Sequence, residues 1–147
     1  MDIKESLKGK KHKLLLLVGK PGSGKSKFLD NYSKENGIPV LDFDTILGQT
    51  IPKDKDANYV YDFIRGFLES YSPDEILLDK KAILYNKDSK IDLLDFLLEL
   101  STNKIVISTW NGYIDHEKGQ LVHVCNKLEK DFIYDLSKLD ITYMELK

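Results

Sequence analysis

The chain has 147 residues, of which 41% are hydrophobic and 31% are charged, and its net charge at pH 7 is −2. This size and composition indicate one folded domain over residues 1–147 and exclude a disordered or collagen-like chain. The single cysteine, Cys125, cannot form an internal disulfide, and the apolar run at residues 14–18 is too short to span a bilayer or serve as a secretory signal. We therefore expect a cytoplasmic protein that makes no membrane contact.

The charge is unevenly distributed along the chain. Residues 1–27 contain eight lysines against Asp2 and Glu5, a balance of +6, whereas the other 120 residues carry 13 lysines and one arginine against 22 acids, a balance of −8. The basic N-terminal segment, residues 1–13, is either a solvated tail or a contact for a polyanion such as DNA. We favour the solvated tail, so any DNA contact is expected to be indirect.

Short apolar runs alternate along the chain with stretches of helical periodicity, and Gly37 stands where the left-handed cap of the first helix is expected. In chain order we predict a strand at 14–18, a helix at 25–36, a strand at 38–43, a helix from Asp56 that ends before Ser72, a strand at 75–79, a helix from Asp88 or Ser89 to about Leu100, a strand at 104–109, a hairpin of 112–115 and 120–125, a short helix at 126–136 and a strand at 141–146.

Strands separated by helices predict an α/β fold. We expect three layers, in which a mainly parallel sheet of about five strands has helices on both faces and a small hairpin follows the fourth strand. The helix that ends near Leu100 is apolar around most of its circumference, so we expect it either to be packed on two sides or to meet a partner.

Residues 19–26 read Gly-Lys-Pro-Gly-Ser-Gly-Lys-Ser, which matches the G-x-x-x-x-G-K-[ST] phosphate loop between a buried strand and a helix. The glycines allow successive N–H groups to turn inward around an anion, and the following helix adds its unpaired amides. Lys25 is then expected to contact the β- and γ-phosphates of ATP, and Ser26 to hold Mg²⁺. The predicted nucleotide-binding residues are Gly19, Lys20, Pro21, Gly22, Ser23, Gly24, Lys25, Ser26 and Lys27.

A phosphate loop predicts an aspartate at the end of a neighbouring buried strand, which holds Mg²⁺ directly or through water. Asp79 follows the run Ile-Leu-Leu and fits this role. In many additional-strand P-loop ATPases a water-orienting carboxylate comes next, but here that position is Lys80. Asp42 and Asp44 are the nearest substitutes. Asp44 is our candidate catalytic residue, although both aspartates also suit a turn after the strand, in which Asp44 or Thr45 caps the next helix.

Thr109 and Asn111 lie at the end of the fourth predicted strand and resemble the sensor position of AAA+-like ATPases, which contacts the γ-phosphate or its water. A turn role suits them equally well. Arg65 is the only arginine in the chain and the only candidate arginine finger, although its amphipathic helix favours an ordinary surface role. The three histidines lack the spacing of metal ligands.

With these residues in view, the sequence resembles the BrxF family, the small P-loop proteins of type 3 BREX phage-defence systems. The similarity covers most of the chain, and it includes residues 14–26, 37–41, 76–79 and 108–112. It implies an ATP-binding component of a bacterial antiviral system that works beside larger BREX proteins. We expect a weak or partner-dependent ATPase whose site is completed by self-assembly, as a homo-oligomer, or by other BREX proteins.

Two other functions fit parts of the sequence. A small-metabolite or nucleotide kinase is favoured by the Asp-x-Asp pattern of Asp42 and Asp44, which resembles shikimate-kinase-like enzymes, but such kinases bind phosphates with several arginines. The other is a nucleotide-gated binding module with slow or no turnover, which Lys80 favours. No Asn-Lys-x-Asp guanine signature is present.

Overall fold

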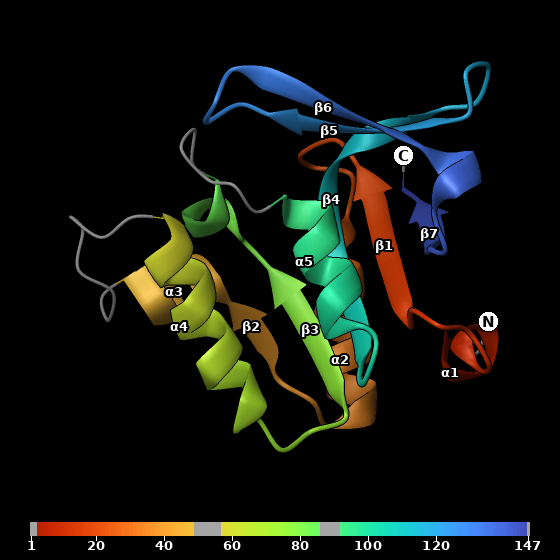
Figure 1. Ribbon diagram of the computed structural model, residues 1–147. Helices are drawn as coiled ribbons and strands as arrows, with labels where there is room; N and C mark the ends of the chain where they lie inside the picture. Colours follow the sequence, from red (N-terminus) through yellow and green to blue (C-terminus); the bar gives the residue numbers. More distant parts are fainter. Residues whose placement is uncertain (1–2, 49–56, 86–91, 147) are drawn as a thin grey trace.

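The computed structural model describes residues 3–48, 57–85 and 92–146 (Figure 1). Within these residues one seven-stranded sheet contains a parallel part in the order β2-β3-β4-β1-β7, and β5 and β6 extend it from β4. The strands are β1 (Leu14–Gly19), β2 (Val40–Asp42), β3 (Glu75–Asp79), β4 (Ile105–Asp115), β5 (Gln120–Cys125), β6 (Lys130–Asp135) and β7 (Thr142–Glu145). The helices are α1 (Ile3–Leu7), α2 (Lys25–Asn36), α3 (Phe43–Gly48), α4 (Ala57–Glu69) and α5 (Leu93–Leu100), with single 3₁₀ turns η1 (Ala82–Leu84) and η2 (Leu136–Lys138).

Helices cover both faces of the parallel sheet. Every residue of β1 is buried, as expected for a strand between two helical layers. Leu14 and Leu16 pack in the core that includes residues of α3, α4 and α5, whereas Leu15 and Leu17 pack with residues of α1 and α2. The alternation along β1 therefore divides the core into two, and the predicted α/β class with a mainly parallel sheet is confirmed.

The residues that cap α2 and α5 are of types that commonly end or begin a helix. Gly37 closes α2 with a left-handed φ of 67°, as predicted. The N-cap of α5 is Asp92, whose carboxylate accepts hydrogen bonds from the amides of Leu94 and Asp95. The predicted caps Asp56, Asp88 and Ser89 lie outside the described residues. The rings of Phe96 in α5 and Tyr61 in α4 meet edge to face, with their centroids 4.9 Å apart. The apolar helix α5 is therefore packed against α4 as well as against the sheet.

The region after β4 corrects one prediction. The hairpin of 112–115 and 120–125 is confirmed, because Gly112 pairs with His123 and Asp115 pairs with Gln120. The predicted helix at 126–136 is wrong, since residues 130–135 form β6, antiparallel to β5. The sequence Lys-Asp-Phe-Ile-Tyr-Asp alternates between more and less exposed residues with the period of a strand, and Glu129 turns the chain with a φ of 52°.

The basic N-terminal segment is folded at residues 3–7, so the expected solvated tail is wrong there. Ile3 and Leu7 of α1 are buried in the core beside β1, and Lys4 forms an ion pair with the buried Glu75 at 3.5 Å. Figure 1 places α1 at the amino-terminal end of β1, away from the glycine-rich loop at its other end. Among the described residues, no helix has the length and apolar character needed to cross a membrane.

Candidate functional site

The carboxyl ends of the parallel strands bring the predicted site residues to one edge of the sheet. In the strand register Asp42 pairs with Asp79, and Gly19 pairs with Asn111. Around this edge lies an open cleft of about 440 Å³, next to the glycine-rich loop, residues 19–26. This is where a doubly wound α/β sheet places its ligands.

The glycine-rich loop has a backbone that only glycine adopts readily. Gly22 and Gly24 have left-handed φ values of 86° and 99°. At Gly19 a Cβ would lie 2.4 Å from Ser23 Oγ and 2.7 Å from the Leu146 carbonyl oxygen, so no side chain fits there. Gly24 is also the N-cap of α2, and because it has no side chain, it provides no side-chain acceptor for the first amides of the helix. The first residues of α2, from Lys25 to Lys27, line the cleft.

Lys25 places a buried positive charge in the loop. Its side chain donates hydrogen bonds to the carbonyl oxygens of Gly19 and Lys20, both at 2.7 Å, and lies 3.4 Å from Ser23 Oγ. Burial lowers the pKa of Lys25, and the nearby carboxylate of Asp79 opposes that shift. An anion in the cleft would add a further opposite charge near the Lys25 amine.

Asp79 joins the loop to the neighbouring strands. Its Oδ2 accepts a hydrogen bond from Ser26 Oγ at 2.7 Å, while Oδ1 accepts from Thr109 Oγ1 at 3.0 Å and from the Lys80 amide at 2.9 Å. The structure thus brings together three predicted site residues, Ser26, Asp79 and Thr109, from three separate parts of the chain.

Lys81 is a further site residue, for which the sequence motifs predict no role. It is 4% exposed, and its Nζ donates to the carbonyl oxygen and to Oγ1 of Thr109 at 2.8 and 3.0 Å. Burial lowers its pKa to about 8, against the attraction of Asp79 and Asp44. The available signal was its position directly before the apolar run Ala-Ile-Leu at 82–84. Tyr85 lines the same cleft and was also missed.

The other two aspartates serve the local structure. Asp42 accepts a hydrogen bond from the Thr45 amide at 3.0 Å, which ends β2 and starts α3, and it lies 3.8 Å from Lys80 Nζ. Asp44 accepts from the Ile83 amide at 2.8 Å and is not among the cleft-lining residues. The candidate catalytic role of Asp44 therefore competes with its role in holding η1 against α3.

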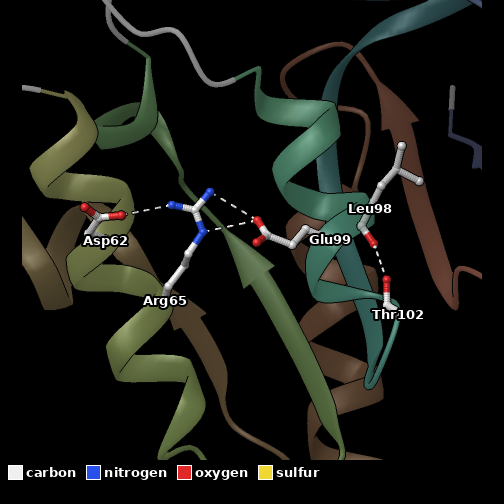
Figure 2. Close-up of polar contacts among 5 residues, drawn as sticks. All are labelled: Asp62, Arg65, Leu98, Glu99 and Thr102. Carbon is white, nitrogen blue, oxygen red and sulfur yellow. Dashed lines mark hydrogen bonds and ion pairs between the residues drawn. The ribbon is translucent and has the colours of Figure 1, made fainter.

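Asn111 and Arg65 lie in different surroundings. Asn111 is exposed at the rim of the cleft, and its side-chain amide makes no hydrogen bond within the described part of the chain. Arg65 bridges α4 and α5 instead, with its guanidinium 3.2 Å from Asp62 and 3.1 Å from Glu99 (Figure 2). The only arginine of the chain is thus engaged in a helix-to-helix contact.

The residues at the cleft suit a magnesium ion that also binds phosphate. Across the described ranges, no three His, Cys, Asp or Glu side chains gather as a metal cage. Mg²⁺ does not need one, because it keeps several waters and binds through one or two protein oxygens together with phosphate. Ser26 and Asp79 supply such oxygens. Comparisons with protein-family models, curated proteins and solved structures found no match.

Proposed function

We propose that the chain is a P-loop protein that binds Mg²⁺ and a nucleoside triphosphate, ATP in our expectation, in the cleft beside residues 19–26. The observation that carries this proposal is the 2.7 Å contact between Ser26 Oγ and Asp79 Oδ2, next to the buried amine of Lys25. A loop hydroxyl and a strand-end aspartate together hold Mg²⁺ in proteins of this class. Asp79 is not part of the sequence motif at residues 19–26, so its contact with Ser26 is independent support for a phosphate loop.

Each part of the site has a distinct task in this proposal. The loop amides and the first turn of α2 bind phosphate oxygens, and Lys25 adds a localised charge. Ser26 and Asp79 hold Mg²⁺, which when bound neutralises phosphate charge. Thr109 orients Asp79 through the hydrogen bond to Oδ1, and Lys81 in turn holds Thr109.

The cleft supports slow turnover by the isolated chain. Asp79 is the only acidic side chain that lines the cleft among the described residues, and its carboxylate accepts hydrogen bonds from Ser26 and Thr109. The next position, Lys80, is not a carboxylate, and its backbone has a left-handed φ of 46°. Hydrolysis therefore needs a water-orienting group from another copy of the chain or from a partner.

The resemblance to the BrxF family supports a biological role for nucleotide binding by this chain. We propose that the chain acts as a nucleotide-dependent component of a phage-defence system, beside larger BREX proteins. A nucleotide-gated binding module agrees with the same contacts. The kinase alternative gains no support from them, because Asp44 holds the Ile83 amide and Arg65 pairs with Asp62 and Glu99.

Calorimetry with Mg·ATP and with Mg·tripolyphosphate tests the binding site. The wild-type protein is expected to bind both, and Lys25→Ala to bind neither. Lys34→Ala, an exposed lysine in the last turn of α2, is the matched control and should bind like the wild type. Equal affinity of the Lys25→Ala and wild-type proteins would refute the assignment.

Phosphate release tests the turnover. The purified chain is expected to release phosphate from ATP at a rate close to that of Lys25→Ala, and faster once it assembles or meets its partner. Fast, Lys25-dependent release by the monomer would contradict the need for an external group. Transfer of phosphate to a small acceptor would favour the kinase instead.

A further inference from the structure

A second cleft, of about 490 Å³, also borders the glycine-rich loop. Pro21 and Asn111 line both clefts, so the two are neighbours. Figure 1 shows β5 and β6 crossing above the end of β1, and residues of the β4–β5 hairpin form one wall of the second cleft. Residues of the loop and of the end of β7 also line this cleft.

The walls of this second cleft are largely apolar. Tyr113 and Val124 of the hairpin line it together with Val18 and Leu146, and the Leu146 amide is fixed by a hydrogen bond to the Val18 carbonyl oxygen at 2.8 Å. Tyr113 is 50% exposed, so its aromatic ring presents surface to solvent. An exposed aromatic ring beside apolar side chains is a surface on which a flat ring stacks.

Polar groups stand at the edges of the apolar walls. The side-chain amides of Asn111 and Asn126 make no hydrogen bond within the described ranges, and the carboxylate of Glu145 is paired with His116 at 2.9 Å. Amides donate and accept hydrogen bonds, as the edge of a nucleobase and the hydroxyls of a ribose require. A few polar groups around an apolar cavity are typical of small-ligand sites.

We propose that the second cleft binds the nucleoside part of the nucleotide, with its base stacked on Tyr113, so that the β4–β5 hairpin is the element that recognises the base and ribose. This inference rests on the proposed function, because only a ligand with phosphates in the glycine-rich loop extends from one cleft into the other. The ligand that suits both clefts is anionic at one end and planar and partly apolar at the other.

The test compares Mg·ATP with Mg·tripolyphosphate, which has the phosphates but no nucleoside. Tyr113→Ala should weaken ATP binding about tenfold, the usual effect of removing one stacked ring, and leave tripolyphosphate affinity unchanged. Tyr113→Phe keeps the ring and should bind ATP like the wild type. Ile133→Ala is the matched control, because Ile133 lies in the same cross-strand row through Val122 and is exposed outside the cleft.

The outcomes separate this inference from the proposed function. If tripolyphosphate shows no Lys25-dependent binding, the proposed function fails. A second outcome is that tripolyphosphate binds, but Tyr113→Ala either lowers the affinities for ATP and tripolyphosphate equally or changes neither. In that case the phosphate site stands and the nucleoside site is overturned. Unchanged tripolyphosphate binding also shows that the Tyr113→Ala protein is folded.

Discussion

The amine of Lys81 donates hydrogen bonds to both oxygens of Thr109, the carbonyl at 2.8 Å and the hydroxyl at 3.0 Å. The Thr109 hydroxyl donates in turn to Asp79, whose other oxygen accepts from Ser26. A continuous row of hydrogen bonds therefore runs from a buried lysine to the glycine-rich loop. A substitution at Lys81 or Thr109 is therefore expected to affect the position of Asp79 and Ser26.

Thr109→Val removes the hydroxyl at the centre of the row and keeps the shape of the side chain. Because Thr109 is buried and Asp79 and Lys81 each lose a partner, the free energy of unfolding should fall by about 2 kcal/mol. Urea denaturation measures this loss. Thr102→Val removes an exposed hydroxyl that reaches only the Leu98 carbonyl oxygen (Figure 2), and a loss as large as that of Thr109→Val would contradict the special role of Thr109.

Asp79→Asn tests the metal assignment. The amide keeps the shape of the side chain but removes the negative charge that attracts Mg²⁺. Titration of ATP binding against Mg²⁺ should show a strong metal dependence in the wild type and little in the variant. An unaltered metal titration would remove Asp79 from the proposed site. Tripolyphosphate binding without metal serves as the control, because it depends on Lys25 and the loop.

Gly112→Ala tests the close approach of β4 and β5. A Cβ at Gly112 would lie 1.8 Å from the Val122 carbonyl oxygen, which also accepts a hydrogen bond from the Trp110 indole at 3.1 Å. The strands must move apart, so the free energy of unfolding should fall by about 3 kcal/mol. At Gly66, in α4, a Cβ meets nothing within 4 Å, and Gly66→Ala should raise the free energy of unfolding by about 1 kcal/mol or less. Equal effects at the two positions would contradict the hairpin geometry.

His123 makes the stability of the fold depend on pH. Burial and the nearby charge of Lys81 lower the pKa of His123 from 6.5 to about 4, so between these values the unfolded chain binds a proton that the folded chain does not. Neutral His123 therefore contributes its full share to the free energy of unfolding above pH 6.5. As the pH falls toward 4, up to about 3 kcal/mol of this free energy is lost. Urea denaturation at pH 7 and pH 5 measures it. His123→Leu should show a smaller loss over this interval than the wild type, and an equal loss would refute the assignment.

The parts of the site that could be predicted from sequence are those coded by adjacent residues. Residues 19–26 form a contiguous motif in which glycine is needed for backbone reasons, and the positive φ values of Gly22 and Gly24 agree with that need. Asp79 ends a short, wholly apolar run, which marks a strand buried on both faces. The α/β class follows from the alternation of such runs with helical stretches.

The element that was predicted wrongly had a weaker local signal. The sequence of residues 126–136 predicts a short helix, whereas residues 130–135 alternate in exposure with the period of a strand. A single β-strand has too few residues for its periodicity to decide against a short helix. Pairing with β5 decides it, because the ladder satisfies the backbone groups of both strands and places Tyr134 near Trp110.

By itself, the sequence determined the fold class, the glycine-rich loop and the aspartate expected beside it, since each depends on residues close together in the chain. Only the tertiary structure decided what surrounds them. It buried Lys81 against Thr109, committed Asp44 to the Ile83 amide, and placed the β4–β5 hairpin beside the loop. These contacts join residues 28 or more positions apart, and their energies depend on burial and orientation, which arise only when the sheet has assembled.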